Sequence, residues 1–371
     1  MRYSPCRRGY HMLRRHTWLK MRYGFVVCLL IVAAMTGPLS PVVHGGHTPE
    51  SAPPARYRHS LVTVNGRVLL FGGQSNSGCP PQGYCNDLWE FDPGSNTFRQ
   101  IVPSNASPSP RSDHGAAEFN GRMYVFGGGA PWFSRDLWYF APGTNTWTQG
   151  STASCFACEL DSRLVHLGGY LYLTVWRGVH SRYDPSTDTW IHGEPPKAPS
   201  PEQWFGTAPI NGKLCSLKAD IDRGTPVEVI CYDEWTGPYP PEHSMSLSGE
   251  LQPSILGPAM AWWGNTVWLF GGGTGSYSQL WASKQVWQYT FTDATTVAVT
   301  RLPDMPTPRM DAAAAPLALQ RTSTVTASAV LAELPIVIFG GMGSSYGAMG
   351  DTLIYTVTVS ANFVYLPLTM R

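Results

Sequence analysis

The chain contains two successive stretches in which the same residues recur in the same order. Residues 56–101 and residues 111–150 each begin with Arg-x-x-His and continue through an apolar run, Asn-Gly, four apolar residues and Gly-Gly. After a variable loop, both resume with Asp-Leu-Trp, an aromatic residue shortly before Pro, and Asn-Thr followed by an aromatic residue. Self-similarity at a period of roughly 20–50 residues is typical of repeat architectures. This repeat constrains the fold more than any other feature of the sequence.

The unit resembles the kelch repeat, in which one copy forms one four-stranded blade of a β-propeller. In both stretches an Asn-Gly pair, beginning at Asn65 and at Asn120, lies between two apolar runs. Such a pair is the strongest short signal for a tight hairpin, because both positions accept a positive φ. We therefore expect each turn to join the innermost strand of a blade (A) to the second strand (B), and strands C and D to follow outward.

Weaker copies of the unit continue to the end of the chain. Blades three to six are anchored at Gly168, Asn211, Gly264 and Arg309. In blade four, the least regular, Trp235 is expected to open strand D. In blade six, residues 320–333 are expected to be an insertion between strands A and B, and residues 363–366 to be strand D. The prediction is an all-β fold, a six-bladed kelch-type β-propeller with four antiparallel strands per blade, over residues 46–371.

Residues 1–45 differ from the rest and are expected to form a leader. Residues 1–49 contain seven basic residues and no acidic one, and residues 23–35 form an apolar run. This run of 13 residues is shorter than the ~20 that span a bilayer, so it favours a cleaved secretory signal peptide. An uncleaved signal anchor and an Arg-rich organelle presequence are the alternatives. A cleaved leader predicts a secreted or lumenal protein without a membrane span in the mature domain.

Beyond the leader, acidic residues outnumber basic ones. Of the 26 basic and 25 acidic residues of the chain, 19 basic and all 25 acidic residues follow position 49. A domain with this balance and without a basic stripe is a poor electrostatic partner for nucleic acid. We therefore expect no nucleic-acid partner.

Six of the eight cysteines follow the leader, and they fall into three local pairs. The pairs are Cys79–Cys85, Cys215–Cys231 and Cys155–Cys158. An even count after removal of a signal peptide is typical of disulfide bonds in an oxidising compartment. The third pair forms C-x-x-C, for which a local disulfide or two buried thiols are favoured over a redox motif or half of a zinc site. The favoured interpretation rests on the β context and on the lack of a second C-x-x-C that would complete a zinc tetrad.

The first arginine of the repeat defines the main candidate binding residues. In a propeller, Arg56, Arg111 and Arg309 would lie in three neighbouring blades and form a basic arc at the channel mouth, opposed by Glu159 and Glu202. Such an arc suits a carboxylate, a sulfate or an acidic peptide. The alternative is that the arginines brace loops through contacts with carbonyl groups.

Histidines and aromatic residues supply further candidates. His59 and His114 occupy equivalent positions in two blades, which repetition explains, with a partial metal site as the alternative. The B–C loops contain aromatic residues that are typical of protein or sugar contacts, unless they fold back over the blades. These residues are Tyr84, Trp132, Phe133, Tyr277 and Tyr346, of which Trp132 is a candidate ligand contact.

No sequence motif indicates catalysis, and we expect no catalytic residue, metal or cofactor. The favoured function is a secreted, monomeric binding module for a protein or a glycan. One alternative is an enzyme that processes sugar acids, similar to the six-bladed sialic-acid mutarotases of the kelch family. The other is an intracellular kelch scaffold. Asn105 begins the sequon Asn-Ala-Ser in the loop between blades one and two, which predicts a glycoprotein, or else an unmodified loop residue.

Overall fold

The computed structural model describes most of the chain beyond the leader. The described residues are 52–79, 82–129, 133–153, 162–175, 178–192, 203–233, 242–276, 278–317, 320–326 and 329–360. Two compact units are distinguished, Met1–Pro41 and Val42–Arg371, and every described residue belongs to the second. Several predictions therefore fall outside the described residues. These concern the leader, Trp132, Cys155, Cys158, Glu159, Glu202, Trp235, Tyr277 and residues 363–366.

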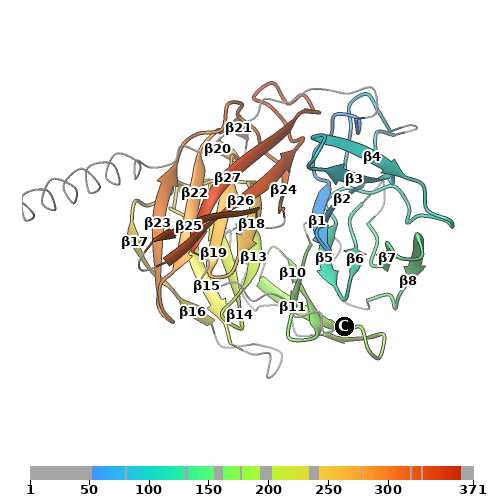
Figure 1. The fold of residues 1–371 in the computed structure, drawn as a ribbon, viewed down its shortest axis with the longest axis horizontal. Helices are drawn as coiled ribbons and strands as arrows, with labels where there is room; N and C mark the ends of the chain where they lie inside the picture. Colours follow the sequence, from blue (N-terminus) through green and yellow to red (C-terminus); the bar gives the residue numbers. More distant parts are fainter. Residues whose placement is uncertain are drawn as a thin grey trace, which may run out of the picture. The chain divides into compact units, whose positions relative to one another are not determined.

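The described residues form six antiparallel blades of a β-propeller, and all their regular elements are strands (Figure 1). Blade one contains β1 (Ser60–Val64), β2 (Arg67–Phe71), β3 (Leu88–Asp92) and β4 (Thr97–Ile101). Blade two contains β5 (Gly115–Phe119), β6 (Arg122–Phe126), β7 (Leu137–Ala141) and β8 (Thr146–Gln149). Blade three contains β9 (Arg163–Leu167), β10 (Tyr170–Val175), β11 (Gly178–Asp184) and β12 (Thr189–His192). The predicted architecture is confirmed.

The second half of the ring follows the same plan with local additions. Blade four contains β13 (Gln203–Ile210), β14 (Lys213–Ala219), β15 (Glu228–Tyr232) and β16 (Glu242–Ser244). Blade five contains β18 (Ala259–Trp263), β19 (Thr266–Phe270), β22 (Val286–Phe291) and β23 (Thr296–Leu302). Blade six contains β24 (Ala313–Pro316), β25 (Gln320–Thr326), β26 (Ala329–Phe339) and β27 (Thr352–Ser360).

Three additions depart from a simple A-B-C-D order. β17 (Ser246–Gly249) precedes blade five in the chain but pairs in parallel with its outer strand β23. β20 (Gly273–Ser276) and β21 (Gln279–Ala282) form a separate hairpin in the B–C loop of blade five. The predicted insertion at residues 320–333 lengthens the A–B hairpin of blade six, because β24 and β25 pair in turn with the same side of β26. No helix within the described residues is long and apolar enough to cross a membrane.

The repeat's asparagines lie where the backbone needs a positive φ. Asn65 and Asn120 have φ values of 49° in the A–B turns, as the Asn-Gly pairs predicted. Asn96 and Asn145 have φ values of 55° in the C–D turns, which explains the Asn of the Asn-Thr-aromatic segment. Asparagine tolerates the left-handed region better than most residues, so these turns form without a glycine at that position.

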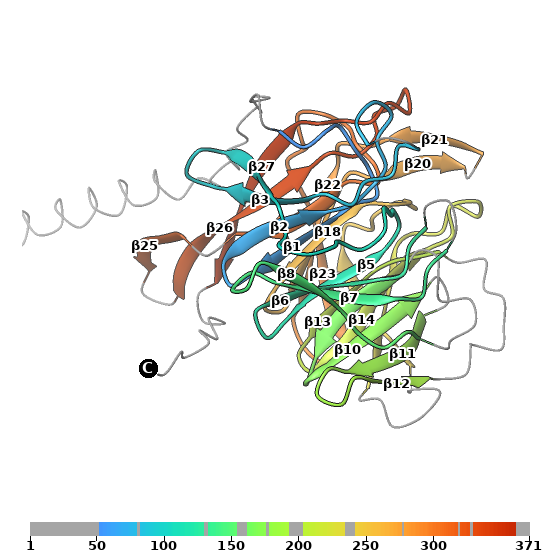
Figure 2. The same cartoon turned by 90° about the vertical axis from the view of Figure 1, so that its right-hand side faces the viewer.

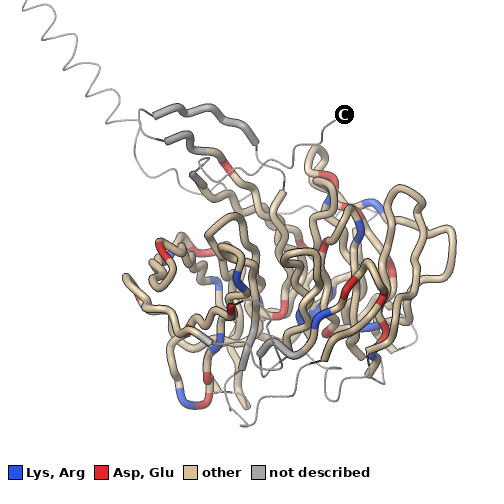
Figure 3. Tube along the Cα trace, turned by 90° about the horizontal axis from the view of Figure 1, so that it is seen from below, with Lys and Arg blue, Asp and Glu red and all other residues tan. Residues whose placement is uncertain are grey.

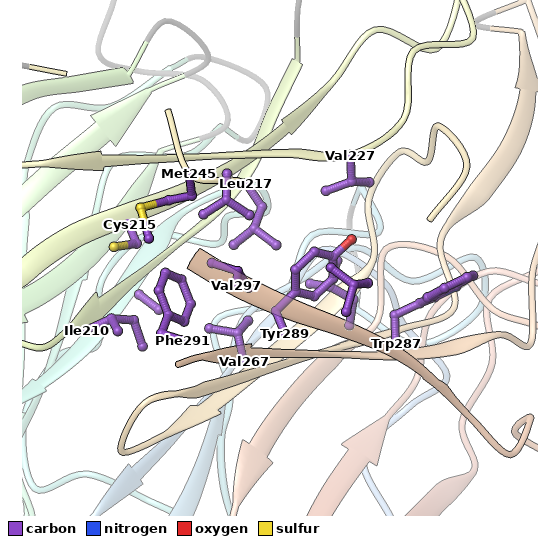
Figure 4. Close-up of a cluster of buried hydrophobic side chains, with 14 of the residues drawn as sticks. Ile210, Cys215, Leu217, Val227, Met245, Val267, Trp287, Tyr289, Phe291 and Val297 are labelled. Carbon is purple, nitrogen blue, oxygen red and sulfur yellow. The ribbon is translucent and has the colours of Figure 1, made fainter. Parts of the chain in front are cut away.

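The hydrophobic core consists of layers between adjacent blades. Figure 4 shows the layer between blades four and five, in which Ile210 and Leu217 of blade four lie near Phe291 and Val297 of blade five. A comparable layer packs blade one against blade six, and β1 and β24 are neighbours there. The ring is therefore closed by side-chain packing between the first and the last blade.

Charged residues are distributed over the described part of the propeller. Figure 3 shows blue and red segments interspersed along the described trace, mostly separated by uncharged residues. Many of them pair with one another, as Arg67 and Arg99 do with Glu90. Such mixed charge does not form a stripe that could follow a phosphate backbone.

Candidate functional site

The three arginines expected at the channel mouth are buried side chains. Each is at most 1% exposed and donates hydrogen bonds to an aspartate of its own blade, with a closest N–O distance of 2.7 Å. The pairs are Arg56–Asp87, Arg111–Asp136 and Arg309–Asp351. Burial alone would raise the pKa of Asp87 and of Asp136, but the hydrogen bonds and charge of the paired arginine outweigh it and lower both. The carboxylates of Asp87 and Asp136 therefore remain ionised and neutralise the guanidinium groups of Arg56 and Arg111.

Each arginine also ties its blade to the preceding one. In every case Nη1 donates to the carbonyl of the first glycine in the blade's own Gly-Gly pair, at 2.8–2.9 Å. The arginine's backbone carbonyl accepts the N–H of the second glycine of the preceding blade, at 2.8 Å. These inter-blade bonds are Gly341 to Arg56, Gly73 to Arg111 and Gly272 to Arg309. The expectation of an accessible basic arc is wrong, and the bracing alternative describes the geometry.

Blade five lacks both charges of this bracing pair. Ile255 occupies the arginine position and is buried, and Gln285 occupies the aspartate position. The Gln285 side chain accepts a hydrogen bond from the indole of Trp287 at 3.1 Å, as Asp136 does from Trp138 at 2.7 Å. Because arginine and aspartate are lost together, no buried charge is left unpaired at this position.

The two candidate histidines also lie inside the protein. His59 packs edge-on against Phe339 of blade six, and His114 against Phe71 of blade one, with ring centroids 5.5 Å apart in both cases. Burial, with a smaller effect from nearby arginine charge, lowers the pKa of His59 well below its ordinary value and that of His114 to about 3. Both imidazoles are therefore neutral, and each packs between its own blade and a neighbouring one.

A metal role has little support among the described residues. Their one group of three potential ligands is Cys79, Cys85 and Asp87. The two cysteines are joined in a disulfide, and the aspartate is held by Arg56. Neither His59 nor His114 belongs to this group.

Both disulfides predicted within the described residues are present. Cys79–Cys85 closes the B–C loop of blade one, with Cα atoms 5.1 Å apart. Cys215 and Cys231 face each other on β14 and β15, with Cα atoms 4.0 Å apart. Asn105 is exposed, and its side-chain amide exchanges two hydrogen bonds with the backbone of Trp147, at 2.7 and 2.8 Å.

The channel mouth carries a different charged group from the one expected. Arg58, two residues after Arg56, lies between Asp113 and Asp311, at 3.4 and 3.1 Å. Its backbone N–H donates to the carbonyl of Asp311, and the N–H of Asp113 donates to the carbonyl of Arg58. All three have φ between 54° and 57°, in the left-handed region, which Asp tolerates better than most residues and which is unfavourable for Arg58. Arg58 is thus held between two aspartates of the neighbouring blades by ion pairs and by backbone hydrogen bonds.

The B–C loops hold half-exposed aromatic side chains, which we call the loop aromatics: Phe133, Trp281 and Tyr346. They are 52%, 54% and 50% exposed, whereas Tyr84 is more buried. The Tyr346 hydroxyl donates to the carbonyl of Leu280 at 3.0 Å and accepts its N–H at 3.2 Å. This clamp fixes the loop after β26 beside the β20–β21 hairpin (Figure 2). Because Leu280 directly precedes Trp281 in the chain, the clamp also brings Tyr346 near Trp281.

Sequence reasoning missed two features of this face. The Asp of Asp-Leu-Trp is the partner of the repeat's arginine. The sequence indicated this pairing, because blade five lacks both the arginine and the aspartate. Trp281 was not singled out, although it is the sole tryptophan in the Gly- and Ser-rich segment between Gly271 and Lys284. Phe133 and Tyr346 were identified as loop aromatics, and both are exposed rather than folded back.

Comparisons with known proteins agree with this architecture. A sequence profile described as "KLHDC2/KLHL20/DRC7 Kelch-repeats domain" matches residues 43–173. "Kelch domain-containing protein 3" of Homo sapiens is 33% identical over 184 residues, which cover 44% of this chain and 47% of that protein. Its Rattus norvegicus counterpart is 34% identical over 85 residues, covering 23% and 21% of the two chains.

A plant protein gives a further match. "Putative adagio-like protein 2" of Oryza sativa subsp. japonica is 42% identical over 83 residues, covering 22% of this chain and 12% of that protein. The chain thus spans less than half the length of these curated relatives. With its repeated Arg–Asp braces, its six blades and these similarities, the chain belongs to the kelch-repeat β-propellers.

Proposed function

We propose that this kelch propeller is an exported module that binds a protein partner through its B–C loop face. Kelch propellers are generally protein-interaction modules. The observation that carries the proposal is the set of loop aromatics, since large aromatic side chains that remain half exposed are favoured contacts in protein interfaces. Single exposed apolar residues are common on any protein, but these three lie on equivalent loops of three blades.

The loops that present these side chains are held in place. Tyr346 is clamped to Leu280, and the B–C loop of blade one is closed by the disulfide Cys79–Cys85. The backbone bonds of Arg58 with Asp311 and Asp113 also join blade one to blades six and two. A rigid binding face loses less conformational entropy on association than a mobile one, which favours affinity.

The export part of the proposal rests on the leader and on cysteine pairing. The basic segment with its apolar run is typical of a signal peptide, and two disulfides suit an oxidising compartment. We propose Asn105 as a glycan site in that compartment, since the residue is exposed and attachment before folding precedes the hydrogen bonds that its amide makes to Trp147. We propose that the mature domain is a monomer.

A glycan remains the second ligand class, because an exposed tryptophan such as Trp281 offers a flat apolar surface on which a sugar ring can stack. The sugar-acid enzyme alternative depended on an accessible basic arc. Since Arg56, Arg111 and Arg309 are buried on carboxylates, that alternative loses its main support.

The test is a binding screen of the exported, non-reduced chain against a displayed library of extracellular proteins and a glycan array. The wild type is compared with the double variant Trp281→Ala/Tyr346→Ala. Ile191→Ala is the matched control, because Ile191 is also exposed but lies on the outer strand β12 of blade three. Ligands bound by wild type and control but lost by the double variant would support the proposal. Ligands bound equally by all three proteins would overturn it.

A further inference from the structure

A groove opens between blades one and two, and none of the loop aromatics lines it. Its walls come from β2, β4 and the residues after β4, and from the end of β7 and the following turn. The lining residues are Arg67, Arg99, Gln100, Ile101, Val102, Phe140, Pro142 and Asn145. Its volume of about 260 Å³ lies just below the roughly 300–1,000 Å³ of sites for drug-sized ligands, so it suits a small ligand.

Two guanidinium groups of this groove share one carboxylate. Arg67 donates to both oxygens of Glu90, through Nε and, at 2.6 Å, through Nη2. Arg99 donates from Nη2 to Oε2 of the same carboxylate at 2.5 Å. Hydrogen bonds from Arg67 lower the pKa of Glu90, so the carboxylate is ionised. The three side chains together therefore carry one net positive charge.

Arg99 retains donors that this arrangement does not use. Its side chain is 69% exposed, and within the described part of the chain its one hydrogen bond is the Nη2 contact with Glu90. A guanidinium presents five N–H donors in a fixed fork that fits planar or tetrahedral oxyanions. Nε and Nη1 of Arg99 are therefore left for a ligand at the edge of the groove.

We infer that this groove binds a small oxyanion, a carboxylate or a sulfate, with Arg99 as its main contact and Arg67 as a second positive charge. The anion compensates the charge that Glu90 leaves unbalanced. Phe140 lies under the groove and is buried, so the accessible lining is mainly polar and suits a small anion. This site is separate from the face of the loop aromatics, so either proposal can fail without the other.

The experiment titrates the intact chain with sodium sulfate and, separately, with sodium glutarate, against sodium chloride at matched ionic strength. Isothermal titration calorimetry measures the binding. We expect saturable binding of sulfate, glutarate or both to wild type, and the stronger of the two identifies the ligand class. Arg99→Gln should weaken it at least about tenfold, since a hydrogen bond to a charged group contributes about that factor. Absence of saturable binding of both anions to the wild type would overturn the inference.

Two further variants make the result specific. Arg301→Gln is the matched control, because Arg301 is also on an outer strand, β23, and pairs with an acidic residue, Asp304, but does not line the groove. Arg301→Gln should bind the anion as tightly as wild type does. If it lost as much affinity as Arg99→Gln, the loss would be due to the change in net charge, and the proposed site would be wrong. Glu90→Gln removes the competing carboxylate and should strengthen binding. Weaker binding by the folded Glu90→Gln variant would refute the proposed competition for Arg99.

Discussion

The buried pair Arg111–Asp136 offers the sharpest test of how the blades are held. Asp136→Asn keeps the side-chain shape but replaces a carboxylate with an amide, opposite a guanidinium that is 1% exposed. Arg111 donates to both carboxylate oxygens, through Nη1 to Oδ1 and through Nη2 to Oδ2, and the indole of Trp138 also donates to Oδ2. An Asn has one acceptor oxygen, so its amide N–H groups would face a donor at the other position. Breaking a buried ion pair by removing one partner costs roughly 3–5 kcal/mol, and the 18% exposure of Asp136 favours the lower end, about 3 kcal/mol.

Blade five supplies the compensating change. Arg111→Ile combined with Asp136→Gln recreates the Ile255–Gln285 arrangement, in which the tryptophan still has an acceptor. Removing both charges together is often close to neutral, so the double variant should lose about 1 kcal/mol, mainly for the hydrogen bond from Arg111 to the Gly127 carbonyl. Equilibrium unfolding in guanidinium chloride measures both free energies. The single variants Arg111→Ile and Asp136→Gln are measured beside it, and a double variant that loses as much stability as the two together would refute the reasoning.

Three further predictions concern the same framework. Gly340→Ala should destabilise the protein more than Gly212→Ala in the same unfolding assay. Both have positive φ, but a Cβ at Gly340 would lie 2.4 Å from a backbone carbonyl oxygen, whereas Gly212 has nothing within 4 Å; equal losses would argue against the contact. His114→Phe should flatten the loss of stability between pH 7 and pH 5. The folded imidazole has a pKa of about 3, so below about pH 6.5 the unfolded chain binds the extra proton, and stability falls by about 2 kcal/mol over that window; an unchanged slope would contradict this. Replacing Cys215 and Cys231 together with Ala should cost about 3 kcal/mol, the loop-closure value for their separation of 16 residues, and a stability independent of reductant in the wild type would contradict it.

The blade architecture was predictable because its signals are local. The Asn-Gly pairs at Asn65 and Asn120 fix tight turns through the φ preference of two adjacent residues, whatever the rest of the blade does. The pairing of Cys215 with Cys231 followed from the same logic, because the strands joined by a short connection are neighbours. Such features need only a few residues of sequence to be specified.

The site was harder to predict because its contacts are distant in the chain. Arg56 meets Asp87 across 31 residues that include a variable loop, so an arginine at the start of an inner strand was interpreted as accessible when it is a brace. The clamp between Tyr346 and Leu280 spans 66 residues and two blades. Its position depends on how neighbouring loops pack, which the repeat pattern does not specify.

We propose that the loop aromatics form the binding surface of this propeller. The most direct measurement replaces Trp281 with the photoreactive residue benzoylphenylalanine and irradiates the protein together with a ligand recovered in the binding screen. The same substitution at Ile191, on β12, serves as the comparison. We expect a covalent adduct from position 281 and none from position 191. An adduct from position 191 with none from position 281 would contradict it.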